Sequence, residues 1–213
     1  TITKNGDPSV VTTSSNFYSN SLDFDASGDY LSSSSSTDFA FGTGDFTIEY
    51  WVNYDDVSTA QKGDFQTSDA SGGLKTTYGS GIKISFGSTS GELAVNIGGS
   101  NVVSASGYTT GVWYHNAITR EGSTVRFFKN GVLQDTASNS SNLSSSTYLA
   151  VGGYYNTSYL MNGRLQDFRI YKGVAKYTSN FLVGSASPDI LPDTPSGVAT
   201  KTALTKINGG AVA

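Results

Sequence analysis

Hydrophobic and polar residues alternate along the central part of the chain, as in a strand with two different faces. The clearest case is GDFTIEYWVNY at 44–54. One face carries Phe46, Ile48, Tyr50 and Val52, and the other carries Thr47, Glu49 and Trp51. A period of two residues predicts a β-strand and not a helix.

Further segments have strand-forming composition and lie between turn residues. They are IKISF (82–86), ELAVNI (92–97), NVVSA (101–105), WYHNAITR (113–120), STVRFFK (123–129), VLQDT (132–136), TYLAVGG (147–153) and GRLQDFRIY (163–171). Asn130 and Gly131 separate two of these segments, and both tolerate the positive φ of a tight hairpin turn. Serine-rich runs at 32–36 and 138–146 cannot bury apolar surface, so we expect loops there. No segment shows a sustained helical period.

These short, two-faced strands predict an all-β fold, a two-sheet antiparallel β-sandwich of jelly-roll type. Pro188, Pro192 and Pro195 follow the last strand and cannot join a central sheet. We therefore expect a compact domain at 16–182, an extended N-terminal arm at 1–15 and a C-terminal tail at 183–213. The tail is too polar to build a core of its own, so we expect it to be an assembly arm that holds the domain on a partner.

The composition narrows the classes of function. At 213 residues, 37% of them hydrophobic, the chain suits one all-β domain with a core. The net charge is −4 and the thirteen Lys and Arg residues are scattered, so we expect no nucleic-acid partner. The absence of cysteine excludes disulfides and thiolate metal sites. No apolar run approaches the roughly 20 residues of a membrane span, and the N-terminal residues lack the pattern of a secretory signal.

Three blocks in this order resemble the laminin-G-like, or concanavalin A-like, jelly-roll family. They are SLDFDASGDYL with FGTGDFTIEYWV, then WYHNAITREGSTVRFFKNGVL, then NGRLQDFRIYKGVAKYTSNF. The last block is similar to the version found in structural proteins of bacteriophages, especially marine ones. The resemblance covers roughly residues 16–182, and it implies a two-sheet sandwich used for binding or display.

The strand WYHNAITR departs from the family pattern. Asn116 and Thr119 flank Ala117 and Ile118, where the family has a more apolar strand. We therefore expect the face that carries Asn116 to be less buried than in relatives.

Carboxylate chemistry of the glycosidase kind is not indicated. Hydrolases on this fold are similar to one another in carrying both glutamates on one strand, in an E-x-D-x-x-E pattern. This chain has three glutamates, Glu49, Glu92 and Glu121, each in a different segment. Glu49 is followed at the next two positions of its face by Trp51 and Asn53. We therefore expect no catalytic residues and no enzyme activity.

His115 is the only histidine in the chain. A zinc site would need further His or Cys ligands, and the chain has none. By alternation, His115 shares a face with Trp113 and Ala117. We expect its ring to fill space between the sheets, with one nitrogen hydrogen-bonded.

The loop DASGD at 25–29 is a candidate metal site. Asp25, Ser27 and Asp29 place oxygen side chains at alternate positions, and such donors suit a hard cation such as Ca²⁺. The family resemblance implies calcium near this region, and Asp167 could approach it from the closing strand. The alternative is an ordinary turn in which Asp and Gly make local hydrogen bonds.

A tyrosine-rich loop is a candidate glycan site. Tyr154, Tyr155, Asn156 and Tyr159 lie close together in GGYYNTSYLMNG. A tyrosine offers a flat apolar face and a hydroxyl, which suit stacking on a sugar ring. The alternatives are that some of these tyrosines belong to the core, cover a sheet edge or contact a neighbouring subunit.

Together these features favour a non-enzymatic bacteriophage virion surface protein, a capsid decoration or appendage protein with glycan adhesion. The alternatives are a tail receptor-binding module for host polysaccharide and a polysaccharide hydrolase. We expect its partners to be other virion proteins, bound through the terminal arms, and further copies of the chain. We expect it on the virion surface, made in the host cytoplasm and released by lysis, with no membrane insertion.

Overall fold

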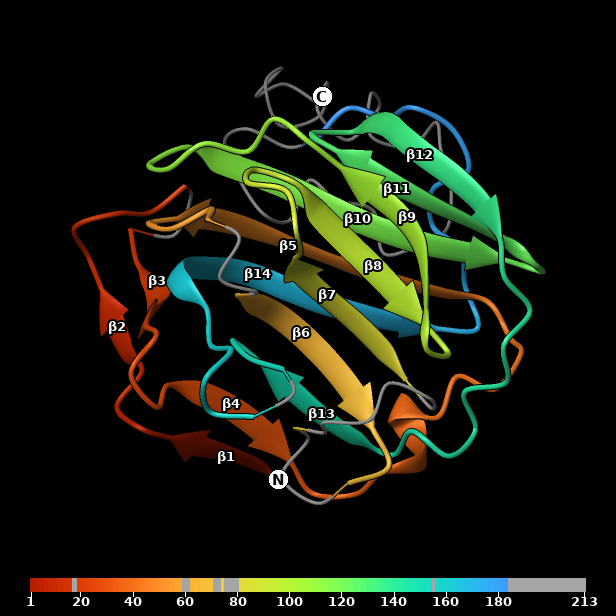
Figure 1. Ribbon diagram of the computed structural model, residues 1–213, viewed down its shortest axis with the longest axis horizontal. Helices are drawn as coiled ribbons and strands as arrows, with labels where there is room; N and C mark the ends of the chain where they lie inside the picture. The colour runs from red at the N-terminus through yellow and green to blue at the C-terminus, as the bar shows by residue number, and fades with distance from the viewer. Residues whose placement is uncertain (17–18, 59–61, 71–73, 75–80, 155, 184–213) are drawn as a thin grey trace, which may run out of the picture.

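The protein is a sandwich of two antiparallel sheets (Figure 1). The structure is a computed structural model, and it describes residues 1–16, 19–58, 62–70, 74, 81–154 and 156–183. The first sheet has the order β1 (Ile2–Asn5), β4 (Tyr30–Ser33), β13 (Tyr148–Val151), β6 (Gly63–Ser68), β7 (Ile82–Phe86), β8 (Leu93–Ile97) and β9 (Ser100–Ala105). The second has the order β12 (Val132–Ser138), β11 (Thr124–Lys129), β10 (Trp113–Glu121), β5 (Phe46–Tyr54), β14 (Asn162–Lys172), β3 (Ser21–Asp25) and β2 (Ser9–Val11). The predicted all-β sandwich is confirmed.

Helical structure is confined to one 3₁₀ turn, η1 (Thr37–Phe39), within the described residues. Ser36 caps this turn by accepting a hydrogen bond from the Asp38 amide. In the same part of the chain, no helix is long and apolar enough to cross a membrane.

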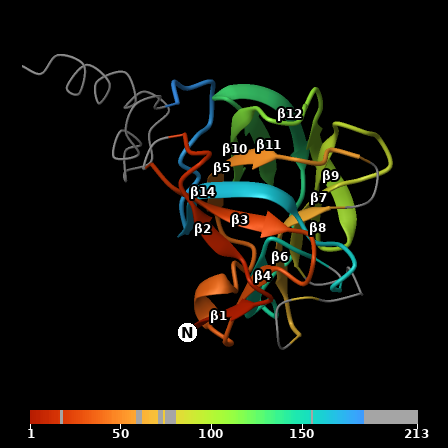
Figure 2. The ribbon, with the colours of Figure 1, turned by 90° about the vertical axis from the view of Figure 1, so that its left-hand side faces the viewer.

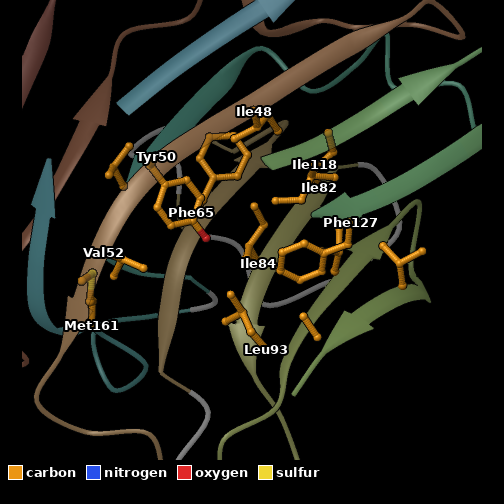
Figure 3. Packing of buried hydrophobic residues seen from close by; sticks show 14 of the residues in the cluster. Ile48, Tyr50, Val52, Phe65, Ile82, Ile84, Leu93, Ile118, Phe127 and Met161 are labelled. Atoms are coloured by element: carbon orange, nitrogen blue, oxygen red, sulfur yellow. The ribbon is translucent and has the colours of Figure 1, made fainter. Parts of the chain in front are cut away.

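The main core lies between the two sheets. From β5, Ile48, Tyr50 and Val52 are completely buried and point toward the first sheet, where Phe65 and Ile84 are equally buried (Figure 3). The alternation in GDFTIEYWVNY therefore gives the core face of β5 correctly. Burial of apolar area on this scale is the main favourable term in folding.

The N-terminal residues differ from the expected arm. β1 pairs with β4 and β2 pairs with β3, so residues 1–15 supply an edge strand to each sheet (Figure 1). Ile2 and Val10 in these strands remain more than half exposed. The strands are held by backbone pairing and bury little, so the hydrophobic pattern gave no signal for them.

Part of the outer face of the second sheet, on β5, β10 and β11, is also buried. Residues 173–183, the C-terminal strap, cross it on the side away from the first sheet (Figure 2). A second, smaller apolar cluster lies under the strap and consists of Ala117, Phe128, Tyr177 and Phe181, with Val183 packed against it.

The expectation that strand WYHNAITR would be less buried is wrong. Asn116 is completely buried on the inner face, where its side-chain oxygen accepts a hydrogen bond of 2.6 Å from the Tyr108 hydroxyl. Thr119 is completely buried on the outer face, where its hydroxyl donates to the Tyr177 carbonyl at 2.9 Å. The Asn116 side-chain oxygen and the Thr119 hydroxyl each have a specific partner, which lowers the cost of burying them. Asn116 Nδ2 has no partner within the described residues. The tail beyond Val183, residues 184–213, lies outside the described residues.

Candidate functional site

Three aspartates converge where the chain between β1 and β2 meets the loop between β3 and β4. Single carboxylate oxygens of Asp7, Asp25 and Asp29 all lie within 4.8 Å of one another. Asp29 is buried and accepts hydrogen bonds from the amides of Asp7 at 2.7 Å and Asp25 at 3.3 Å. Burial raises the pKa of the Asp29 carboxyl, and these two amide bonds act in the opposite direction.

The cluster contains two of the four predicted metal ligands, Asp25 and Asp29, and adds Asp7. Asp167 is held by Arg169, whose Nε donates to its carboxylate at 2.8 Å, and it is not among the clustered carboxylates. It lies in an irregular part of β14, with a positive φ of 53°. Ser27 contributes its backbone amide to the Asp25 carboxylate at 2.7 Å.

The donor set matches the chemistry of a hard cation, since all three side chains supply carboxylate oxygens. Asp7 and Asp25 are exposed, so their oxygens are accessible from solvent. Asp7 was missed by sequence reasoning because it lies 18 positions before Asp25 and reaches the loop only through the pairing of β1 with β4.

The tyrosine-rich loop does not present the predicted stacking face. Tyr154 is completely buried and stacks on Tyr159, with ring centroids 5.4 Å apart. Lys83 places its Nζ 4.7 Å from the centre of the Tyr154 ring. Since no part of Tyr154 is exposed, its role in sugar stacking is wrong.

The rest of that loop is closed by its own hydrogen bonds. Asn156 accepts from the Ser158 amide at 2.8 Å, and the Tyr159 amide donates to the Asn156 carbonyl at 3.2 Å. Asn156 and Tyr159 are half-buried. Tyr155 lies outside the described residues.

The three glutamates lie in separate environments. Glu49 is completely buried under the strap and accepts a 2.8 Å bond from Lys176 Nζ. Glu92 accepts from the Ser104 hydroxyl at 2.7 Å, and Glu121 pairs with Arg126 at 3.1 Å on the surface. No pair of glutamates is brought together to act as acid and nucleophile.

His115 is buried, but its location differs from the prediction. The ring lies under the strap on the outer face of β10, against Trp51 at 5.2 Å and Phe181 at 5.8 Å, and not between the sheets. Neither ring nitrogen has a hydrogen-bond partner in the part of the chain that the structure describes. Burial lowers the pKa of His115 to about 4, against the attraction of the Glu49 carboxylate. The ring is therefore neutral at pH 7 and buried away from solvent.

A polar groove of about 190 Å³ lies where β8 and β9 of the first sheet approach β12 of the second. It is lined by Glu92, Ala94, Asn101, Val102, Val103, Ser104 and Asp135. Ser104 holds both acids, because its hydroxyl donates to Glu92 and its amide donates to Asp135 at 3.0 Å. Sequence reasoning missed this groove because its residues come from three strands, none of which is unusual alone.

An apolar cavity of about 310 Å³ lies between the sheets near their opposite edges. Its apolar lining comes from Ile2, Leu22, Leu31, Leu149, Val151, Leu165 and Phe168. Ile2 is 57% exposed, so the cavity is bordered by an accessible apolar side chain.

Comparisons with known proteins agree with this architecture. A family model, Laminin_G_3, described as the concanavalin A-like lectin/glucanases superfamily, matches residues 25–176. No curated protein matches the chain in sequence.

Solved structures give the same result for the fold. Domain 4 of AbnA, a GH43 extracellular arabinanase from Geobacillus stearothermophilus in complex with arabinotriose, is similar over 92% of this chain and 87% of that one, with 16% identity and a TM-score of 0.59. The binding domain of botulinum neurotoxin serotype D/C is similar over 82% of this chain and 44% of that one, with 16% identity and a TM-score of 0.58. Mouse laminin alpha1 domains LG4-5 are similar over 78% and 44%, with 13% identity and a TM-score of 0.53. At these identities the likeness is one of fold, and the chain spans under half the length of the last two.

Proposed function

The chain belongs to the concanavalin A-like lectin/glucanases superfamily, and from this premise we propose that it is a non-enzymatic glycan-binding module displayed on the surface of a bacteriophage virion. The family includes both binding and hydrolytic proteins, so the side chains must decide between these classes.

The observation that carries the proposal is the state of the glutamates. Glu49 is buried under the strap and paired with Lys176, and Glu121 is paired with Arg126 on the surface. Of the three glutamates, Glu92 alone lines the polar groove. A glycosidase needs two carboxyl groups on either side of the bond to be cleaved. Asp135 lines the same groove as Glu92. Both carboxylates accept a hydrogen bond from Ser104, one from its hydroxyl and one from its amide, and we therefore assign them to ligand binding.

The polar groove suits a neutral glycan. Glu92, Asn101 and Asp135 offer oxygen acceptors for sugar hydroxyls, and Ala94 and Val102 offer apolar surface for the ring carbons. The lining has no basic side chain, so an anionic ligand would be repelled. One protein of the same fold was solved with arabinotriose, so binding an oligosaccharide is within the range of this fold.

The binding proposal is tested by titrating the protein against a panel of bacterial and algal oligosaccharides. We expect Asp135→Asn to weaken binding of the best ligand at least about tenfold, or roughly 1.4 kcal/mol. The control is Gln134→Ala, the neighbouring position on β12, which is exposed and outside the groove. Loss of binding in Tyr159→Ala with Asp135→Asn unaffected would place the site in the tyrosine loop and contradict the groove.

The virion role is supported by the resemblance of residues 162–181 to the corresponding segment of phage surface proteins. The tail expected at 183–213 is proposed to hold the domain on the particle, on other virion proteins or on further copies of the chain. Because Val183 packs against the second apolar cluster, we assign this contact to residues 184–213. Capsid decoration is the first candidate and a tail receptor-binding module the second. Electron microscopy of particles carrying a label on this protein separates them, and particles without label in either place would contradict both.

A further inference from the structure

The C-terminal strap is joined to the outer face of the second sheet by a row of hydrogen bonds. Thr47 on β5 is central, since its hydroxyl donates to the Val174 carbonyl at 2.9 Å and accepts from the Lys176 amide at 2.8 Å. Thr119 on β10 donates to the Tyr177 carbonyl at 2.9 Å, and the Phe181 amide donates to the Gly131 carbonyl at 2.8 Å. The strap is therefore a third layer with a defined register on β5, β10 and the β11–β12 turn.

Aromatic packing holds the last part of the strap. The Tyr177 and Phe181 rings are stacked with centroids 3.6 Å apart and a 6° angle between planes. Phe181 also packs edge-on against Phe128 at 5.5 Å and His115 at 5.8 Å. These contacts do not depend on pH, provided that His115 stays neutral.

An ion pair holds the first part of the strap. Lys176 Nζ lies 2.8 Å from Glu49 Oε1, and both side chains are completely buried. Lys176 Nζ also donates to the Tyr171 hydroxyl at 3.0 Å. Removing the charge of one member of a buried pair leaves the other charge in a low-dielectric site without compensation.

The layer under the strap is incompletely satisfied. Neither ring nitrogen of His115 has a hydrogen-bond partner within the part of the chain that the structure describes. His115 Nε2 lies 3.8 Å from Glu49 Oε2, too far for a hydrogen bond. Buried polar groups of this kind regain water when the layer opens, which favours opening here before elsewhere.

Charged and titratable groups reach this layer from four elements. They are Glu49 on β5, His115 on β10, Asp167, Arg169 and Tyr171 on β14, and Lys176 and Tyr177 on the strap. Asp167 and Arg169 form their own 2.8 Å pair. Burial raises the pKa of the Tyr177 phenol above its ordinary value, which already exceeds physiological pH, so the phenol stays neutral. Acid can therefore change the charge at His115 and Asp167, and each change makes the surroundings of Lys176 more positive.

We propose that the C-terminal strap is an acid-released clasp: protonation of His115 beside the buried Glu49–Lys176 pair detaches residues 173–183 from the outer face of β5 and β10 while the two-sheet sandwich stays folded. Lys176 is a buried cation whose charge is matched by the Glu49 carboxylate. Protonated His115 adds a second cation beside it, within a layer that excludes water. Release exposes Trp51 and frees the strap for another contact. This inference is independent of glycan binding.

The sandwich core responds to acid in the opposite direction. Asp64 lies between the sheets and burial raises its pKa to about 7, so the folded core holds a proton that the unfolded chain releases at neutral pH. Its contribution to stability is fully present below the unfolded pKa and is lost as pH rises through about 7. His115, with its lowered pKa, contributes stability that is lost as pH falls from its unfolded value toward about 4. Acid thus weakens the strap without weakening the core at Asp64.

The test is amide hydrogen exchange of the full chain between pH 7.5 and pH 4, corrected for the pH dependence of intrinsic exchange. We expect protection of the strap amides of Lys176 and Phe181 to fall at least tenfold more than that of core amides on β5. A Trp113→Phe variant, with Trp51 as its only tryptophan, should show a red shift of emission over the same range. Equal protection of the strap at both pH values, or loss of strap and core together, would overturn the proposal.

Two variants separate the clasp from general acid sensitivity. Glu49→Gln should lower strap protection at pH 7.5 toward the acid value of the wild type. Lys176→Met removes the neighbouring cation and leaves the Glu49 carboxylate to pair with protonated His115, so acid should no longer loosen the strap of this variant. If Glu49→Gln does not fold, Lys176→Met decides the question. Glu121→Gln, at the exposed pair with Arg126 on the same sheet, is the control and should behave as wild type. Acid release of the strap in Lys176→Met to the wild-type extent would contradict the mechanism.

Discussion

Two buried side chains, Asp64 and His115, make stability depend on pH in opposite directions. The Tyr50 hydroxyl donates to Asp64 Oδ2 at 2.7 Å, the Tyr54 hydroxyl donates to the same oxygen, and burial outweighs both bonds in raising the pKa of Asp64 to about 7. Burial lowers the pKa of His115 to about 4. Their pH windows overlap between about 4 and 6.5, so the two contributions partly cancel in the wild type.

Asp64→Asn is expected to expose this cancellation. Asparagine is neutral at every pH, like the protonated form of Asp64. The wild type loses stability as Asp64 ionises toward pH 7, and the variant does not. The free energy of unfolding of the variant relative to wild type should rise with pH by about 1 kcal/mol per unit between pH 4.5 and 7. Urea unfolding of both proteins at several pH values measures this difference. Parallel stability profiles for the two proteins would contradict the raised pKa of Asp64.

The Asp7, Asp25 and Asp29 cluster makes a prediction about calcium. If the cluster holds Ca²⁺, the ion raises the melting temperature by mass action, because the unfolded chain does not keep the three carboxylates together. Asp7→Asn removes the charge of one exposed ligand and leaves buried Asp29 with its hydrogen bonds to backbone amides. The melting temperature of this variant should therefore no longer respond to calcium. Thermal melts in calcium and in chelator measure the effect. Identical wild-type melts in both would exclude the site.

Single side chains were predictable where local alternation governs them. His115 could be assigned to a packed strand because the WYHNAITR pattern fixes its burial, although not the layer that covers it. Tyr154 could not be assigned, because it lies in a loop without alternation and its ring packs against Tyr159 of that loop and Lys83 of β7. Asp7 gave no signal because it lies in the segment interpreted as an arm.

At the scale of elements, β5 shows how much a hydrophobic pattern determines. The pattern identifies the inner face of β5 with Ile48, Tyr50 and Val52, and the structure confirms it. The outer face, with Thr47 and Glu49, is completely buried as well. A polar strand face predicts exposure to solvent. Here the face is covered because a distant segment brings Val174 and Lys176 to bond with Thr47 and Glu49.

The turn of the β11–β12 hairpin, at Asn130 and Gly131, is in contact with the strap. Asn130 and Gly131 both have positive φ, 52° and 77°, as the Asn-Gly signal predicts. A Cβ at Gly131 would lie 2.0 Å from the Phe181 carbonyl oxygen, whereas a Cβ at Gly122, also at positive φ, would meet nothing within 4 Å.

Gly131→Ala should therefore lower the free energy of unfolding by more than about 1 kcal/mol. Backbone strain accounts for about 1 kcal/mol, and the displacement of the strap adds a further loss. Gly122→Ala, in the neighbouring β10–β11 turn, carries only the strain and is the matched control. Chemical denaturation of both variants measures the difference. Equal destabilisation would show that the strap does not press on this turn.

At the scale of the whole molecule, the two-sheet sandwich and its family could be predicted from the sequence, but the edge strands β1 and β2 could not. Strand composition and the three ordered blocks carried the fold, because both reflect a large, regular core. β1 and β2 are short and exposed, and pairing, not burial, holds them. The polar groove was equally hidden, because Glu92, Ser104 and Asp135 meet only when β12 reaches β9.

The proposed assembly arm predicts separable folding and assembly. A chain ending at Val183 keeps both sheets and the strap, so its melting temperature should stay within a few degrees of the full chain. Its incorporation into particles should be lost, because residues 184–213 are proposed to make the contact. Calorimetry and a particle-incorporation assay measure the two properties. Normal incorporation of the shortened chain would contradict the arm, and an unfolded product would assign the tail to the core.

The most direct test of non-enzymatic glycan binding is the mass of an oligosaccharide recovered from its complex with the protein. The best ligand from the panel is incubated overnight with wild-type protein, isolated with it by size exclusion and measured by mass spectrometry. We expect the oligosaccharide to be retained with the protein at its starting mass, identical to ligand kept in buffer alone. Shorter fragments that are formed by the wild type and absent with Glu92→Gln would show hydrolysis at the groove and contradict the proposed function.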